Sequence, residues 1–225
     1  FQNVVTEISR TIKDLLISLK TKEEWLKEGN TLYSLKRYED ALAVYEQAIH
    51  LDPNYAYAYT SKGNALNYLK RYQEGLIACE QAIRLDPHAI AYNNKGNALF
   101  GLKRYKEALA AYEQAIHLDP DLAHAYNGKG DVLHEFKRYE EALAAYEQAI
   151  RLDPNFAIAY NNKGSTLHNL KRYQEALAAY EQAIRLDPDF AIAYNNKGNT
   201  LFGLKHFEEA KQAHEKARQL GYGSQ

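Results

Sequence analysis

One pattern recurs along the chain at an almost constant interval of 33 or 34 residues. Each copy has a glycine inside a short apolar segment and, in five copies, a proline that follows "LD" 24 residues later. The recurring glycines are Gly29, Gly63, Gly96, Gly130, Gly164 and Gly198, and the recurring prolines are Pro53, Pro87, Pro120, Pro154 and Pro188. A unit this short cannot bury its apolar side chains alone, so the repeat predicts a fold in which neighbouring units stack.

Each unit shows two segments with helical periodicity. In the fifth unit, the segment Ala157–Leu170 has Tyr160 and Leu167 two turns apart, and Tyr173–Leu186 continues with apolar residues every three or four positions. The proline after the second segment cannot continue a helix and also restricts the residue before it. We therefore expect two antiparallel helices in every unit.

The spacing of aromatic and small residues resembles the tetratricopeptide repeat, and this resemblance covers about nine-tenths of the chain. In the fifth unit the matching residues are Tyr160, Gly164, Leu167, Tyr173, Ala176, Tyr180, Ala183 and Pro188. The resemblance implies an all-α fold, a right-handed superhelical solenoid of six helix-turn-helix repeats preceded by an N-terminal amphipathic helix. It also implies that the first helix of each unit lines the concave face.

The expected domain boundaries follow from the repeat. Residues 1–20 are predicted to form a capping or linker helix, and residues 21–225 the solenoid. Its units are 22–55, 56–88, 89–122, 123–156, 157–190 and 191–224. The first segment carries an apolar stripe of Phe1, Val5, Ile8, Ile12, Leu15 and Leu19, which favours a cap over the first unit and leaves a dimerisation helix open. Thr21 followed by Glu24 predicts a capping box at the first repeat helix.

The second unit departs from the others. The chain reads "LDPHAIAY" where other units read "LDPNFAIAY", so one residue is missing. The same unit has Gly75 where the others have alanine, and Cys79 where most have tyrosine. We expect a softer or differently angled junction near Pro87–Ala91.

Asparagine recurs in the first helix of the units, although it is unfavourable inside a helix. The column with Asn94, Asn162 and Asn196 is expected to lie off the buried stripe. Its amides could pair with the N–H and C=O groups of an extended peptide, and the resemblance implies the same role. The predicted peptide-groove residues are Asn30, Asn64, Asn93, Asn94, Asn97, Asn127, Asn161, Asn162, Asn195, Asn196 and Asn199. The alternative is that they serve solubility or bonds between repeats.

Several substitutions between units fall on the same face and are predicted to set specificity. These residues are Tyr57, Phe100, His124, Asp131, His134, His168 and Phe202. Tyr68 is expected to point into the groove together with Tyr57. A metal site at the histidines is disfavoured because no tight ligand motif is present. The lysines that precede the recurring glycines are interpreted as solvated, with a positive groove rim as the alternative.

Composition excludes several classes of function. The chain has 28 basic and 29 acidic side chains, which disfavours nucleic acid as a partner. It has one cysteine and no apolar run of membrane-spanning length, so we expect a cytoplasmic location and no membrane partner. No phosphate loop or arrangement of nucleophile and base stands out, so we expect no enzyme activity and no cofactor.

The sequence therefore predicts a non-catalytic module that binds an extended or helical segment of a partner protein in an Asn-lined concave groove. A structural spacer that forms homo-oligomers through its N-terminal helix or solenoid ends is one alternative. Another is a regulatory C-terminal domain of a larger signalling enzyme, such as a bacterial protein kinase. The absence of methionine and the start at Phe1 fit a piece of a longer protein.

Overall fold

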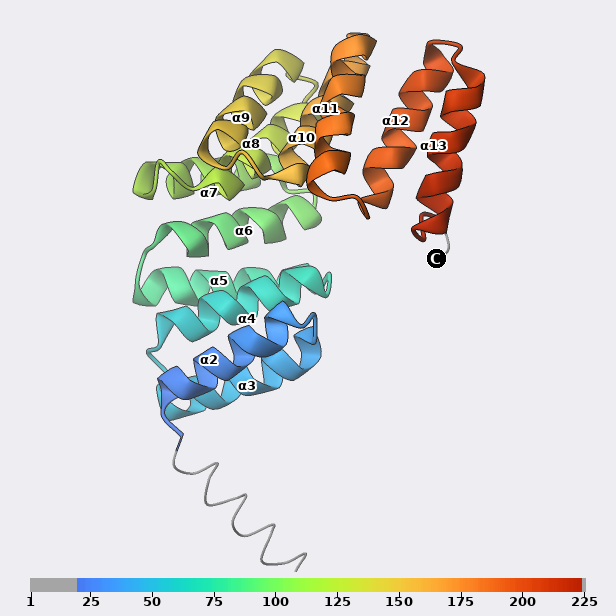
Figure 1. Ribbon diagram of the computed structural model, residues 1–225. Coiled ribbons are helices and arrows are strands. Elements are labelled where there is room, and N and C mark those ends of the chain that lie inside the picture. The colour runs from blue at the N-terminus through green and yellow to red at the C-terminus, as the bar shows by residue number, and fades with distance from the viewer. Residues whose placement is uncertain (1–19, 224–225) are drawn as a thin grey trace, which may run out of the picture. The chain divides into compact units, whose positions relative to one another are not determined.

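The computed structural model describes residues 20–223, which form pairs of antiparallel helices without a strand in that range (Figure 1). The first helices of the pairs are α2 (Lys22–Ser34), α4 (Ala56–Tyr68), α6 (Ala89–Gly101), α8 (Ala123–Glu135), α10 (Ala157–Asn169) and α12 (Ala191–Gly203). The second helices are α3 (Tyr38–Leu51), α5 (Tyr72–Leu85), α7 (Tyr105–Leu118), α9 (Tyr139–Leu152), α11 (Tyr173–Leu186) and α13 (Phe207–Gln219). The predicted all-α repeat fold is confirmed. The predicted N-terminal helix and its apolar stripe lie outside the described residues.

The ends of the helices follow from local sequence. The Thr21 hydroxyl accepts a hydrogen bond from the Glu24 backbone N–H at 3.2 Å, and the Glu24 carboxylate accepts one from the Thr21 N–H at 2.8 Å. The predicted capping box is therefore confirmed. Helix α3 ends at Leu51, and Asp52 before the proline is extended with φ −140°, because proline disfavours the helical conformation of its predecessor.

The turn inside each pair depends on a lysine in the left-handed conformation. Lys36, Lys70, Lys103, Lys137, Lys171 and Lys205 have φ between 58° and 65°. At the first of these turns the Lys36 N–H donates to Tyr33 O and the Arg37 N–H to Leu32 O, both at 2.9 Å, which is a Schellman motif. A non-glycine residue costs about 1–2 kcal/mol in this conformation. Sequence reasoning missed this feature, since lysine has no preference for it.

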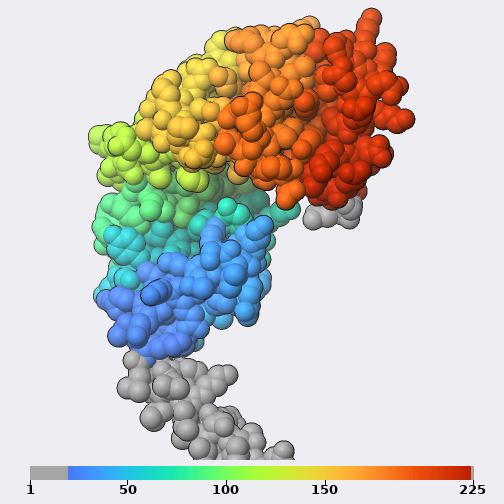
Figure 2. Space-filling model, viewed as in Figure 1, coloured from blue at the N-terminus to red at the C-terminus, as the bar shows by residue number. Residues whose placement is uncertain are grey.

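The chain divides into two compact units, one that ends at Leu102 and one that begins at Lys103. Within each unit the first helices of successive pairs contact each other: α2 with α4 and α4 with α6, then α8 with α10 and α10 with α12 (Figure 1). The atoms of neighbouring pairs within a unit are packed against each other (Figure 2). Among the described residues of either unit, second helices of successive pairs make no such contact. Each stack is therefore tighter on the side of the first helices, which we call the inner face.

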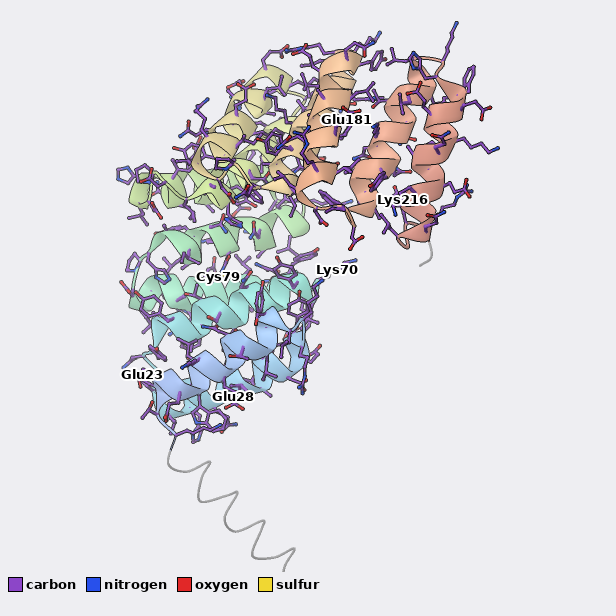
Figure 3. The ribbon with its side chains drawn as sticks, viewed as in Figure 1. Glu23, Glu28, Lys70, Cys79, Glu181 and Lys216 are labelled. Carbon is purple, nitrogen blue, oxygen red and sulfur yellow. The ribbon has the colours of Figure 1, made fainter. Side chains whose placement is uncertain are left out.

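Glycine and tyrosine determine how closely the two helices of a pair approach. A Cβ atom added at Gly29 would lie 2.4 Å from the Tyr45 ring, and one at Gly164 would lie 2.6 Å from the Tyr180 ring. Both tyrosines are almost fully buried. In the second pair the buried Cys79 takes the place of this tyrosine, under Gly63 (Figure 3). Large flat rings thus fill the space that small residues leave open.

The junction between α5 and α6 differs from the others, as predicted. The residue before α6, His88, is extended with φ −140° and ψ 157°, whereas Tyr55 before α4 has φ −81° and ψ 87°. The ring of His88 also lies 3.2 Å from the Thr60 hydroxyl, measured from Nε2 to Oγ1. The missing residue therefore changes the backbone between the two pairs. Greater softness at this junction stays a prediction.

Extra hydrogen bonds join α4 to α6 at this junction. The Asn67 amide donates to the backbone oxygen of Asn94 at 2.8 Å, and the Asn94 amide donates to the backbone oxygen of Thr60 at 3.4 Å. Asn67 also explains Gly75, because a Cβ atom there would lie 2.5 Å from Asn67 Oδ1. The glycine thus makes room for a side chain that links the two pairs.

Candidate partner-binding face

The 3.6-residue period divides each first helix into two sides. On α4, Tyr57, Asn64 and Tyr68 lie close together around the helix, and Lys62 and Leu66 lie on the opposite side. Tyr57 and Tyr68 are 52% and 60% exposed, whereas Leu66 is buried. The exposed side is the inner face, and the same positions of the other first helices lie on it too.

A strip of apolar side chains recurs at the position of Tyr57. Ile90 in α6, Ile158 in α10 and Ile192 in α12 are 48–52% exposed. In α8 the equivalent residue is His124, whose ring packs against Phe156 with centroids 4.7 Å apart. The three isoleucines were missed by the sequence reasoning, although they occupy the same column as Tyr57. Large apolar side chains held half in water at a repeated position are typical of a surface that contacts another molecule.

Amide side chains form a hydrogen-bonded chain across three pairs of the second unit. Asn196 donates to Asn161 Oδ1 at 3.0 Å, and Asn161 donates to Asn162 Oδ1 at 3.2 Å. Asn162 then donates to Asn127 Oδ1 at 3.3 Å and to Asp131 Oδ1 at 2.9 Å, and Asn127 donates to Asp131 Oδ2 at 3.2 Å. We call these five residues the amide chain. It joins α8, α10 and α12 through side chains alone.

The first unit has fewer such bonds. Asn93 donates to Asn94 Oδ1 at 3.4 Å. The Tyr45 hydroxyl donates to Asn30 Oδ1 at 2.9 Å, and Asn64 donates to the Tyr33 hydroxyl at the same distance. Most of these amides therefore stabilise contacts within or between pairs.

Burial divides the predicted groove residues into three groups. Asn93, Asn94, Asn127 and Asn161 are 4–8% exposed, so the expectation that the column of Asn94 lies off the buried stripe is wrong for Asn94 itself. The half-buried members are Asn64, Asn97, Asn162, Asn195 and Asn196, and the exposed ones are Asn30 and Asn199. The unfavourable helix propensity of the buried asparagines is offset by their bonds to neighbouring helices. Their role toward a partner stays a prediction.

Asp131 is the charged member of the amide chain. It also accepts a hydrogen bond from the Tyr146 hydroxyl at 2.8 Å. Burial, together with the nearby Glu135, raises the pKa of this carboxyl to about 7, although the hydrogen bonds from Tyr146, Asn162 and Asn127 favour the charged form. The group therefore titrates near neutral pH inside the repeat stack.

Two of the predicted specificity histidines link neighbouring first helices. His134 Nδ1 lies 2.8 Å from Thr166 Oγ1, and His168 Nδ1 lies 2.8 Å from Thr200 Oγ1. Both threonines are fully buried, and each donates its hydroxyl proton to a backbone oxygen one turn earlier. Burial lowers the pKa of His134. Sequence reasoning missed the threonines, whose column varies between alanine, valine and threonine in the other units.

The two predicted phenylalanines differ in exposure. Phe202 is 61% exposed, and its ring packs edge-on against Phe207 with centroids 5.4 Å apart. Phe100 is half-buried. Among residues 20–223, no group of three or more histidine, cysteine or carboxylate side chains is arranged to hold a metal ion.

The lysines before the recurring glycines are ion-paired, so the interpretation that they are merely solvated is wrong. Each pairs with a glutamate of the preceding second helix, and the lysine side chains are only 26–31% exposed. The pairs are Lys62–Glu46, Lys95–Glu80, Lys129–Glu113, Lys163–Glu147 and Lys197–Glu181. Beside three of them lie shallow hollows of about 240–530 Å³. Because this side of the helix is opposite the inner face, these lysines do not charge that face.

Comparison with known families assigns the fold. Tetratricopeptide repeat models match residues 29–69, 56–88, 93–157, 138–189 and 179–212. The chain belongs to the tetratricopeptide repeat family. Proteins with this repeat are generally non-catalytic scaffolds for protein–protein interaction. No curated protein sequence matches the chain.

Solved structures of repeat proteins support the same fold. The chain superposes with a TM-score of 0.85 on one chain of the Cut9–Hcn1 hetero-tetramer of the APC/C, at 16% identity over 95% of its own length. The chain spans 43% of that protein's length. PilF of Pseudomonas aeruginosa gives a TM-score of 0.73 at 19% identity, with 90% of this chain and 92% of PilF covered. YrrB, described as a TPR protein with an unusual peptide-binding site, gives 0.54 at 27% identity, with 82% and 94% covered.

From residue 20 to residue 223, every helix is too short or too polar to cross a membrane.

Proposed function

We propose that the chain is a protein-binding module whose inner face holds a segment of a partner protein. The observation that carries the proposal is that two neighbouring first helices in each unit, α4 and α6 or α10 and α12, hold a half-exposed apolar side chain at the same position. The tetratricopeptide repeat fold supports a protein-interaction scaffold, and the peptide-binding site described for YrrB favours a peptide as the guest.

The chemistry of the face fits a segment with apolar side chains and a polar backbone. A guest on the first unit would cover Tyr57 and Ile90 with its side chains, and a guest on the second unit would cover Ile158 and Ile192. Beside this strip, exposed or half-buried amides such as Asn30 and Asn199 offer donors and acceptors to backbone groups of the guest. The buried asparagines would act indirectly, because they fix the spacing of the helices. Selectivity would come from residues that differ between units, above all Tyr57, His124 and Phe202.

The affinity should depend on a few apolar contacts. Covering one half-exposed isoleucine removes an area worth about 1 kcal/mol. Each unit offers two such contacts, which are partly offset by the entropy lost when the guest becomes ordered. Micromolar affinity corresponds to about 8 kcal/mol, so polar contacts with the amides and with neighbouring side chains must supply the larger part of it.

The test compares four substitutions on the inner face with three substitutions of similarly exposed apolar residues on second helices. The inner-face variant carries Tyr57→Ser, Ile90→Ser, Ile158→Ser and Ile192→Ser. The control carries substitutions of similarly exposed side chains on second helices, Leu51→Ser, Ile77→Ser and Leu118→Ser. Twelve-residue peptides are selected from a random phage library on the unmodified chain, and their dissociation constants are measured by fluorescence polarisation.

We expect the selected peptides to bind the inner-face variant at least tenfold more weakly and the control within about twofold of the unmodified chain. Circular dichroism should show the same helix content in all three proteins. Equal losses in both variants, or a library that yields no peptide, would contradict the proposal.

A further inference from the structure

Three tyrosines of the first unit form a cluster at the end of the inner face. The rings of Tyr38 and Tyr68 are stacked with centroids 5.1 Å apart. Tyr33 meets Tyr38 and Tyr68 edge-on, at 5.2 Å and 5.4 Å. Although it contacts both neighbours, Tyr68 remains 60% exposed. The neighbours hold its ring in place, so it forms a rigid aromatic platform open to solvent.

A second aromatic platform lies on the same side of the same helix. Tyr57 is 52% exposed, and its ring rests against His88 at 5.2 Å and Tyr55 at 6.3 Å. Eleven residues separate Tyr57 from Tyr68, which is about three helical turns and a distance of about 16 Å along the axis of α4. The two rings therefore mark the two ends of one helix-long surface.

The surface between the platforms carries amides and no formal charge from its own helices. The only charged side chains of α4 and α6 are Lys62 and Lys95, and both lie on the opposite side, paired with glutamates. Asn64 lies between the platforms and uses one amide hydrogen on the Tyr33 hydroxyl at 2.9 Å. Its second amide hydrogen has no partner in the described part of the chain. A strongly charged guest would find no counter-ion on these two helices.

We infer that this surface takes an uncharged, proline-rich segment in the polyproline II conformation. This inference rests on the proposed function and names the class of guest for the first unit. Proline rings pack on the faces of aromatic side chains, and a polyproline II backbone makes no internal hydrogen bonds, so its carbonyl oxygens accept from donors such as Asn64. Such a segment rises about 3.1 Å per residue, so five or six residues reach from Tyr57 to Tyr68.

A helical guest fits the same features less well. It would need about eleven residues to span the two rings, and its backbone carbonyl oxygens would already be bonded within the helix. The amide donor of Asn64 would then have no backbone acceptor. The preformed polyproline II conformation also loses less entropy on binding than a disordered apolar segment does.

The experiment measures binding of a fluorescein-labelled nine-residue peptide of the repeat Pro-Pro-Leu by fluorescence polarisation, up to millimolar protein. The comparison peptide has alanine at every proline. The proteins are the unmodified chain, Tyr57→Ser, Tyr68→Ser and the control Ile77→Ser, whose side chain is similarly exposed on the second helix α5 of the same unit. Circular dichroism and urea unfolding establish that all four are folded.

We expect the proline-rich peptide to bind the unmodified chain and the control alike, and to lose about tenfold in affinity with each tyrosine variant. Tyr68→Phe should restore binding, because the ring face and not the hydroxyl is the contact. Failure of the proline-rich peptide to bind, or equal binding to all variants, would overturn the inference. If the alanine peptide bound in a tyrosine-dependent way instead, the inference would fail while the proposed function would stand. If no library-selected peptide depended on the inner-face residues, the proposed function itself would fail.

Discussion

Replacing Asp131 with asparagine should change how stability depends on pH. The carboxylate lies half-buried in the amide chain, where it accepts hydrogen bonds from Tyr146, Asn162 and Asn127. Four other units have asparagine at the equivalent position, so Asp131→Asn restores the common residue of the repeat. The new amide can keep the bonds from Tyr146 and Asn162 through its oxygen, whereas Asn127 must turn its own amide to accept.

The expected change in the free energy of unfolding follows from the pKa of Asp131. Burial raises the pKa of Asp131 from 3.8 to about 7. Because the folded state holds this proton more tightly than the unfolded state, the stabilising contribution is present below about pH 4 and is lost as the pH rises to about 7. One pKa unit is worth about 1.4 kcal/mol, so the loss is about 4 kcal/mol at most. Residual contact of the carboxylate with water reduces this loss, and we expect about 1–3 kcal/mol.

Urea unfolding followed by circular dichroism, in half-unit steps from pH 4 to pH 8.5, measures the effect. The variant should match the unmodified chain near pH 4 and exceed it in stability by about 1–3 kcal/mol at pH 8. Asp189→Asn, at an exposed site, is the matched control for the loss of one carboxylate. A difference between Asp131→Asn and the unmodified chain that stays constant from pH 4 to pH 8 would refute the reasoning.

Three further predictions concern stability and reactivity. Lys137→Gly should stabilise the fold by up to about 1 kcal/mol in urea unfolding, because Lys137 has φ 58° and glycine adopts this conformation without strain. A variant that unfolds at a lower urea concentration than the unmodified chain would show that Lys137 is not strained. Gly164→Ala should lower the free energy of unfolding by about 1–3 kcal/mol, because the new methyl group would lie 2.6 Å from the Tyr180 ring. The control Gly203→Ala, whose methyl group would have no atom within 4 Å, should be neutral or stabilising in the same assay. Burial raises the pKa of Cys79 to about 12, so Ellman's reagent at pH 8 should react only as urea unfolds the chain, and rapid reaction of the native protein would show an accessible thiol.

The sequence predicted the elements that depend on local chemistry. The repeat of glycine, tyrosine and proline indicates two helices per unit, and Thr21 with Glu24 indicates the first helix start. The left-handed lysines could not be predicted in this way, since their conformation is imposed by the approach of the two helices and not by a preference of lysine.

The candidate site was predictable only in part. The column of Tyr57 lies on the inner face by helical spacing, and the same spacing could have identified Ile90, Ile158 and Ile192. The burial of Asn94 could not be found from the period alone, because it depends on how closely α4 and α6 pack. Likewise, which amide donates to which depends on side-chain rotamers and on the distance between helices, and sequence carries neither.

The most direct test of the inner face as a binding surface uses isoleucine methyl groups. The chain is labelled with ¹³C at isoleucine δ1 methyls, assigned by single Ile→Val substitutions, and titrated with a library-selected peptide. If the inner face binds the peptide, chemical shifts will change at Ile90, Ile158 or Ile192, and none will change at Ile77, which is similarly exposed on a second helix. Changes at Ile77 with the three inner methyls unmoved would contradict it.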